Sequence, residues 1–318
     1  MGRIETQVEM LVDEFAGRRP LRTGSLVMTI FGDAIAPRGG ALWLSSLIGL
    51  LRIFKLSERL VRTSVTRLAK DDWLLAEPIG RQSMYRLSPD GLDHLRTASE
   101  RIYQGPRPRW DGKWHLVLLG GVQTQHRERL RRRLRRLGFG PLSTEVMAHP
   151  TLDWQSVERH FTNSDGWAGA LMMTGSIDQT PQHSTLHAMV QSSWALDELN
   201  QRHAAFLGTF RPLYQTIKKV RRVSPKHAYQ LRILMIHEYR KTMLRDPYLP
   251  ETLLPPDWNG YAAYQLCRNI YARIAAASDE FISETALTPD GPLPSPDTAF
   301  FQRFDAAVPI QSRVGRTK

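Results

Sequence analysis

The sequence predicts a multidomain α+β protein, in which an N-terminal winged helix-turn-helix is followed by a ferredoxin-like α+β domain and a mostly helical C-terminal domain. Three observations predict this fold class: a helix with one basic face at 57–73, two short strands directly after it, and alternating strand and helix patterns in 113–190. The predicted parts are an N-terminal extension at 1–22, the winged helix at 23–103, a linker at 104–112, the ferredoxin-like domain at 113–190, the helical domain at 191–285 and a flexible tail at 286–318.

Two apolar-rich segments, 26–36 and 42–54, precede the basic helix, and we expect both to be helical. The segment Pro37-Arg38-Gly39-Gly40 separates them, because proline and glycine interrupt regular structure. The second segment is the most apolar run of the chain, but it contains Arg52 and is too short to cross a bilayer. It therefore predicts a buried helix, and we expect no membrane partner.

Residues 57–73 are the most informative stretch of the chain. Ser57 is a suitable N-cap, and Val61, Val65 and Leu68 recur at helical spacing as an apolar stripe. Another face contains no acid and consists of Arg59, Arg62, Thr63, Thr66, Arg67 and Lys70. Guanidinium groups bind phosphates and guanine edges, and threonine hydroxyls reach bases or phosphates, so this face predicts a DNA-recognition helix. The alternative interpretation at this point is a solvated basic surface.

The residues after this helix favour the DNA-binding interpretation. Segments 74–78 and 83–87 read as two short strands joined by a turn at 79–82, and a further helix start follows at Ser88-Pro89. Helix, helix, helix, ribbon and helix is the order of a winged helix-turn-helix. In such a domain a helix enters the major groove of double-stranded DNA and the wing reaches the adjacent backbone or minor groove. The wing residues expected to contact DNA are Arg81, Gln82 and Arg86.

The middle of the chain begins with the linker 104–112, which contains two prolines and two glycines. Beyond it, strands and helices alternate as in a ferredoxin-like domain. The helix at 125–137 carries a cluster of seven arginines within 127–136. These arginines could contact DNA, bind the phosphates of an effector, or cover apolar surface with their stems while facing solvent. The sequence leaves these three readings open.

The C-terminal region and the composition set further limits. Segments 194–215, 228–244 and 261–283 predict helices, whereas the Pro-rich stretch 289–296 and the cationic end predict a mobile tail. The net charge of +12 favours a polyanionic partner. The single cysteine, Cys267, excludes an intrachain disulfide framework and a Cys-rich zinc site, and no export signal is visible, so we expect a cytoplasmic protein.

Several motifs resemble the PaaX family of bacterial repressors of phenylacetate catabolism. The resemblance extends over about residues 25–285 and is carried by Ile30-Phe31-Gly32-Asp33, Pro37-Arg38-Gly39-Gly40, Val61-Arg62-Thr63-Ser64, Gly80-Arg81-Gln82-Ser83, Trp194-Ala195-Leu196-Asp197, Leu249-Pro250, Leu253-Leu254-Pro255 and Asp257-Trp258-Asn259-Gly260. It implies a homodimeric repressor that binds a palindromic operator and is released by an acyl-CoA, with phenylacetyl-CoA as the expected effector. It also implies that the middle domain is similar to the Cas2 nucleases.

The effector site is the least determined part of this hypothesis. An arginine can pair with a phosphate or donate to a thioester carbonyl, and aromatic rings can face a phenyl group. On that basis Tyr239, Arg240 and Trp258 are candidates, although packing of the C-terminal helices would explain them as well. We expect the effector to bind the part of the chain that follows the linker. A fragment of residues 1–103 should therefore retain weak DNA binding and lose the response to the effector.

Two alternatives to this hypothesis stay open. One is an enzyme, which either acts on acyl-CoA or is a Cas2-like nuclease fused to a DNA-binding domain. The other is a repressor of the same family that senses a different aromatic acyl-CoA. The nuclease reading is poorly supported, since 118–122, after the first strand of the middle domain, contains no Asp or Glu to hold a metal ion. No Walker loop, Rossmann glycine set or nucleophile elbow occurs, and we expect no catalytic residue, cofactor or metal.

Overall fold

The computed structural model describes residues 2–103, 105, 109–152, 154–161, 166–176 and 183–306. The chain forms two compact units. Unit 1 comprises Met1–Gly105, Ala205–Leu244 and Ala262–Lys318, and unit 2 comprises Pro106–Ala204 and Arg245–Tyr261. The helices of the predicted helical domain at 191–285 are divided between these two units. Parts of the predicted linker and of the predicted tail lie outside the described residues.

The N-terminal elements of unit 1 follow the predicted order with one addition. Helix α2 (Thr23–Ile30) continues as a π-helical turn η1 (Phe31–Ile35) and a short 3₁₀ turn η2 (Ala36–Arg38). Strand β1 (Ala41–Trp43) comes next and is followed by α3 (Leu44–Arg52), α4 (Glu58–Lys70), β2 (Leu74–Ile79), β3 (Gln82–Leu87) and α5 (Pro89–Tyr103).

Strand β1 is the addition, since the sequence pattern predicts helix from residue 42. Gly39 and Gly40 both have positive φ angles, which lets the chain turn sharply after η2. The turned chain pairs with β3, where Leu42 lies opposite Tyr85. The result is an antiparallel three-stranded sheet in the order β1-β3-β2.

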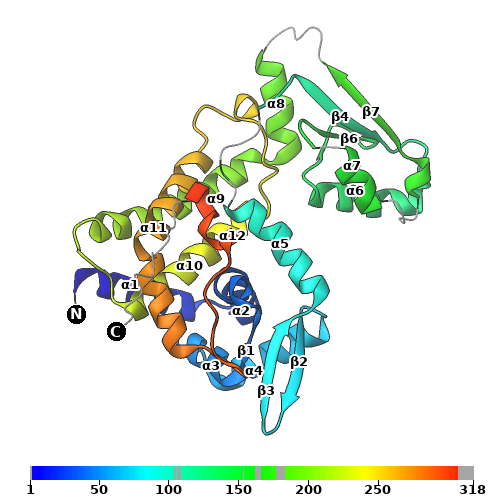
Figure 1. Ribbon diagram of the computed structural model, residues 1–318. Helices are drawn as coiled ribbons and strands as arrows, with labels where there is room; N and C mark the ends of the chain where they lie inside the picture. Colours follow the sequence, from blue (N-terminus) through cyan, green and yellow to red (C-terminus); the bar gives the residue numbers. More distant parts are fainter. Residues whose placement is uncertain are drawn as a thin grey trace. The chain divides into compact units, whose positions relative to one another are not determined.

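A second group of helices completes the core of unit 1. Helix α10 (Pro225–Met243) is buried over nearly its whole circumference, as expected for a helix at the centre of a core. It contacts α2 and α1 (Arg3–Gly17), whose apolar stripe from Ile4 to Phe15 is buried. The C-terminal part of α9 (Leu196–Ile217) and most of α11 (Gly260–Thr285) belong to the same unit. The elements from α1 to α5 therefore share one core with helices that follow the middle domain in sequence (Figure 1).

The predicted flexible tail is wrong for residues 286–306. This segment forms the short strands β8 (Leu287–Thr288) and β9 (Gly291–Pro292) and the short helices α12 (Thr298–Phe301) and α13 (Arg303–Ala306). Phe300 and Phe304 are buried in unit 1, with exposed fractions of 1% and 0%. A proline-rich composition suggested mobility, but two aromatic anchors hold the chain in place. The predicted mobility of 307–318 concerns residues outside the described part.

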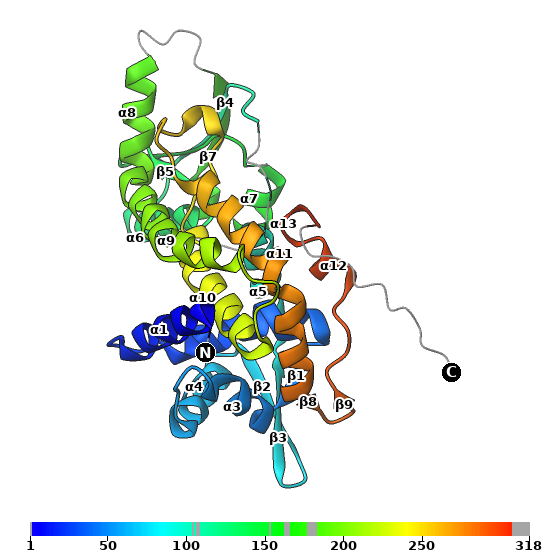
Figure 2. The same cartoon turned by 90° about the vertical axis from the view of Figure 1, so that its left-hand side faces the viewer.

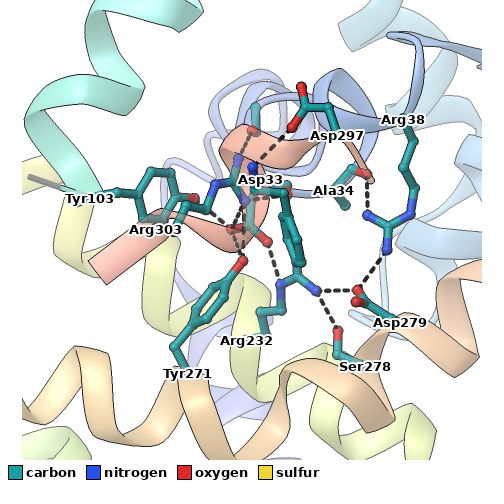
Figure 3. A network of polar contacts seen from close by, with 12 residues as sticks. Asp33, Ala34, Arg38, Tyr103, Arg232, Tyr271, Ser278, Asp279, Asp297 and Arg303 are labelled. Atoms are coloured by element: carbon teal, nitrogen blue, oxygen red, sulfur yellow. Dashed lines mark hydrogen bonds and ion pairs between the residues drawn. The ribbon is translucent and has the colours of Figure 1, made fainter. Parts of the chain in front are cut away.

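A buried polar network joins the N-terminal and C-terminal parts of unit 1 (Figure 3). At its centre is Asp33 of η1, which is 1% exposed. Its Oδ2 accepts from Arg232 Nε at 2.6 Å, and its Oδ1 accepts from the hydroxyls of Tyr103 at 2.5 Å and Tyr271 at 3.0 Å. The Nη1 atom of Arg303 on α13 lies 3.3 Å from Oδ1. Elements from residue 31 to residue 303 are thus linked through one carboxylate.

The charges in this network account for the ionisation of Asp33. Burial by itself would raise the pKa of Asp33, but the charges of Arg232 and Arg303, together with the hydrogen bonds from Tyr103 and Tyr271, lower the pKa below its ordinary value. Arg232 also contacts Asp279 at 2.6 Å, and Asp279 pairs with Arg38 at 2.9 Å. Three arginines therefore depend on two carboxylates, which makes each carboxylate important for stability.

Unit 2 contains the predicted α+β domain. Its elements are β4 (Lys113–Leu118), α6 (Thr124–Arg136), β5 (Gly140–Pro141), β6 (Val146–His149), α7 (Trp154–Phe161) and β7 (Leu171–Ser176). The strands pair antiparallel in the order β5-β6-β4-β7. In order of appearance these are the second, third, first and fourth strands, which is the ferredoxin-like arrangement that the alternating pattern predicts.

The two faces of this sheet are covered by different segments. Helices α6 and α7 pack on one face through a cluster that includes Leu130, Val157 and Phe161 (Figure 1). A second cluster joins Trp114 of β4 to α8 (His183–Trp194) and to the leucines of the proline-rich segment around η4 (Glu251–Leu253). The LP and LLP motifs therefore belong to the core of unit 2.

Candidate nucleic-acid interface

Helix α4 presents the predicted basic face to solvent. The Ser57 hydroxyl accepts from the backbone N–H of Leu60 at 3.4 Å, which caps the helix at the predicted position. Val61 and Val65 are fully buried and fix the opposite face against the core of unit 1. All the predicted contact residues of this helix are exposed, and they are Arg59, Arg62, Thr63, Thr66, Arg67 and Lys70.

The predicted absence of acids from this face is wrong, because two acids at the ends of α4 reach it. Glu58 pairs with Arg62 at 2.7 Å, and Asp71 approaches Arg67 at 3.6 Å. Such pairs are exposed and separated by one helical turn, so each contributes only about 0.3–0.5 kcal/mol. A phosphate can therefore replace the carboxylate at little cost, and the pairs hold the guanidinium groups in place in the free protein.

The two threonines of the face are also engaged in the free protein. Thr63 Oγ1 donates to the carbonyl of Arg59 at 2.9 Å, and Thr66 Oγ1 donates to the carbonyl of Arg62 at 3.0 Å. A hydroxyl that donates in this way retains its lone pairs. The threonines are thus prepared to accept a hydrogen bond, whereas the arginines donate.

The hairpin of β2 and β3 supplies the predicted wing. Ile79 pairs with Gln82, so the turn consists of Gly80 and Arg81, and Gly80 has a φ angle of +60°. Glycine at the first position of a two-residue turn is typical of type II′. Figures 1 and 2 both show the hairpin extending from the helices of unit 1 with this turn at its far end. Arg81 and Gln82 are exposed there, and Arg86 is exposed nearer the base, where it pairs with Glu77.

Arg240, one of the three effector candidates, lines a cavity of unit 1. The cavity has a volume of about 390 Å³ and lies between α2, α4, α5 and α10. Arg240 Nη1 donates to the carbonyl of Ser25 at 2.9 Å and to Thr29 Oγ1 at 2.8 Å. Burial of this guanidinium lowers the pKa of Arg240 from its ordinary value.

The other two effector candidates are not brought to that cavity. Tyr239 is 1% exposed, and its ring packs against Phe206 with a centroid distance of 5.3 Å. Trp258 belongs to unit 2, where its ring lies 5.3 Å from that of His203. Sequence reasoning missed the apolar lining of the cavity because it comes from four separate segments, α2, α4 with the residues after it, α5 and the end of α10; these residues are Met28, Leu68, Trp73, Leu95 and Leu244.

The arginines of α6 divide into structural and exposed groups. Arg127 pairs with Glu145 at 2.9 Å, Arg131 donates to the carbonyl of Ser143 at 3.2 Å, and the Arg133 guanidinium lies 4.7 Å from the centre of the Phe161 ring. These three side chains hold α6 on its domain. Arg132 and Arg136 are exposed and one helical turn apart, so both guanidinium groups face solvent.

Neither a metal site nor a membrane span is found in the part of the chain that the structure describes. Within the described ranges, no group of three or more histidine, cysteine, aspartate or glutamate side chains is arranged to hold a metal ion. No helix in the same ranges combines the length and the apolar character that a membrane span requires.

Comparisons with known proteins identify three consecutive family matches. Residues 22–91 match the family described as PaaX-like protein, 107–185 match the PaaX protein central Cas2-like domain, and 194–284 match the PaaX-like protein C-terminal domain. Together these matches cover most of the chain and include both α4 and the wing.

One relative that aligns over nearly its whole length agrees with these matches. The chain is 37% identical over 305 residues, which is 96% of its length and 95% of the relative's, to the transcriptional repressor PaaX of Escherichia coli strain K12. That relative is a regulator and not an enzyme, so neither enzyme alternative is retained. Among solved structures, the uncharacterized protein Rv0674 from Mycobacterium tuberculosis matches with a TM-score of 0.49 and 23% identity, covering 74% of this chain and 90% of that one.

Proposed function

Since this chain belongs to the PaaX family of transcriptional repressors, we propose that it represses an aromatic-acid catabolic operon, that of phenylacetate, by binding double-stranded operator DNA. The observation that carries this proposal is the exposure of all nine predicted contact side chains on two neighbouring elements, α4 and the wing hairpin. A repressor of this kind acts in the cytoplasm, where the operator lies.

We infer that the elements from α2 to β3 form a winged helix-turn-helix. Three helices, a first strand between the first two of them, and a two-stranded hairpin after the third support this inference. In that arrangement α4 enters the major groove through Arg59, Arg62, Thr63, Thr66, Arg67 and Lys70. The hairpin then reaches the neighbouring backbone or minor groove through Arg81, Gln82 and Arg86.

Operator titrations at several salt concentrations test this assignment. Arg62→Ala and Arg67→Ala should each weaken binding by about 1–3 kcal/mol if they contact bases, or reduce the salt slope by about one if they contact phosphates. Arg222→Ala serves as the control, because Arg222 is also exposed and paired with an acid, Glu280, but lies outside α4 and the wing. Unchanged affinity of a folded Arg62→Ala, Arg67→Ala double variant would remove α4 from the interface.

The pair of Arg62 with Glu58 offers a test in the opposite direction. Glu58→Gln frees Arg62 and removes a negative charge from the face, so it should tighten binding to any DNA sequence and steepen the salt dependence. Weaker binding by this variant would indicate that Glu58 itself contacts a base.

We propose a homodimer, because one winged helix covers few base pairs and two half-sites give the specificity that a genome requires. Edge strand β7 supports a contact through unit 2, since Leu171, Met172 and Met173 are 67%, 37% and 50% exposed there. Exposed apolar side chains on a sheet edge favour pairing with another strand. Met173→Glu should shift the protein to a monomer in sedimentation analysis, whereas Met10→Glu, at a methionine of α1 that is 66% exposed, should not.

The proposed effector is phenylacetyl-CoA, which should release the operator complex by binding the DNA-incompetent arrangement more tightly. Gel shifts with phenylacetyl-CoA, free phenylacetate and CoA test this directly. We expect phenylacetyl-CoA to release the complex and the other two compounds to leave it intact. Free phenylacetate lacks the phosphates that this basic protein can bind, and CoA lacks the arylacyl group. If only a different aromatic acyl-CoA releases the complex, the repressor hypothesis stands and that compound is the effector.

A further inference from the structure

The cavity behind α4 has the composition of a ligand site. Its walls are mainly apolar, with Met28 from α2, Leu68 and Trp73 at the end of α4, and Leu95 from α5. Its volume of about 390 Å³ falls within the range of about 300–1,000 Å³ that small-molecule sites occupy. An aromatic group would find apolar contacts on several sides.

Arg240 supplies one polar feature of this cavity. Among the residues that the structure describes, no carboxylate forms an ion pair with it, and its only hydrogen bonds are those of Nη1 to Ser25 and Thr29. Within the described residues, the N–H groups of Nε and Nη2 are thus left without a protein acceptor. A guanidinium edge of this kind binds a carboxyl-derived oxygen, either the carbonyl of a thioester or a free carboxylate.

The position of the cavity connects it to the proposed DNA interface. Leu68 lies in the last turn of α4, directly after Arg67, and Trp73 follows the helix, with its backbone N–H donating to the carbonyl of Leu68 at 2.9 Å. The ring of Trp73 lies 5.1 Å from that of His94 on α5. A ligand that displaces Leu68 or Trp73 therefore displaces the end of α4 that carries Arg67 and Lys70.

We infer that this cavity is the subsite for the arylacyl group of the effector, with the apolar walls around the ring and Arg240 donating to the carbonyl oxygen. This inference rests on the proposed function and adds the location of the sensor. A cavity of this size holds the acyl group and leaves the nucleotide part of the CoA outside. Binding then moves α4 directly, within unit 1.

Calorimetric titration of the full-length protein with phenylacetyl-CoA, acetyl-CoA, CoA and phenylacetate tests the inference. Arg240→Gln should weaken phenylacetyl-CoA binding about 10- to 100-fold, as the loss of a hydrogen bond to a charged group does. Lys241→Gln is the matched control, because Lys241 is the next residue of α10 and pairs with Glu238. Ala98→Phe fills the cavity from α5 and should abolish the preference for phenylacetyl-CoA over acetyl-CoA, whereas Thr97→Phe adds the same ring at an exposed position outside the cavity.

The outcomes separate this inference from the proposed function. If the wild type binds phenylacetyl-CoA and leaves the operator, but folded Arg240→Gln and Ala98→Phe variants bind it equally well, the subsite lies elsewhere and the proposed effector stands. If the wild type binds none of the four compounds, the effector and the subsite both fall, while operator titration still decides DNA binding. If phenylacetate binds with the same dependence on Arg240, the cavity is confirmed and the thioester requirement is wrong.

Discussion

Replacement of Asp33 by asparagine should destabilise unit 1 more than any surface change. The substitution keeps the size of the side chain but removes the negative charge that Arg232 and Arg303 contact at 2.6 Å and 3.3 Å. The network then contains three buried or partly buried arginines and a single carboxylate, Asp279, which is already shared between Arg38 and Arg232. The asparagine NH₂ group or carbonyl can satisfy only part of this set.

The expected magnitude follows from the cost of leaving a buried charge unpaired. Removal of one partner of a buried ion pair costs about 3–5 kcal/mol. At about 2–4 °C per kcal/mol for a unit of this size, the melting temperature should fall by about 6–20 °C. Glu280→Gln on α11 breaks an exposed pair with Arg222, and it should change stability by less than about 0.5 kcal/mol.

Scanning calorimetry of the full chain at neutral pH measures both variants. Addition of Arg303→Met to Asp33→Asn removes one surplus cation and should recover part of the loss. If Asp33→Asn melts at the temperature of the wild type, the network is not an ionic core. If Glu280→Gln loses as much as Asp33→Asn, the effect does not depend on burial.

Three other changes have defined outcomes. Burial, together with Lys241 and Arg240, lowers the pKa of His237 well below its ordinary value. Below about pH 6.5 the unfolded chain therefore binds more protons than the folded chain, and the free energy of unfolding should decrease as the pH is lowered. Urea denaturation across pH should show a smaller decrease for His237→Gln. Gly80→Val forces a strained φ at the wing turn and should cost about 1 kcal/mol or more, weakening operator binding in gel shifts without loss of α4. The fragment 1–103, which the sequence alone predicted to bind DNA weakly, should instead show no cooperative thermal unfolding, because it lacks α10 and leaves Asp33 without Arg232 and Arg303; a cooperative transition would restore it as an independent domain.

The sequence alone determined α4 and the β2–β3 hairpin well, for a local reason. The N-cap Ser57, the spacing of Val61 and Val65, and the turn glycine Gly80 are short-range signals, and all three act in the structure at their predicted positions. The strand and helix alternation of the middle domain is also local, and its ferredoxin-like order followed from it. The pairing of Arg62 with Glu58 lay within reach of the same reasoning, because acids one turn away on a helix are neighbours.

Only the tertiary structure decided where the segments of the C-terminal half pack. The division of 191–285 between two units, and the burial of Phe300 and Phe304 in place of a mobile tail, depend on contacts between residues far apart in the chain. The Phe31-Gly32-Asp33 motif carries no local signal of its role, since Arg232 and Arg303 reach Asp33 across 199 and 270 positions. The walls of the cavity beside Arg240 likewise come from four separate helices, and no periodicity in the sequence records which helices will meet.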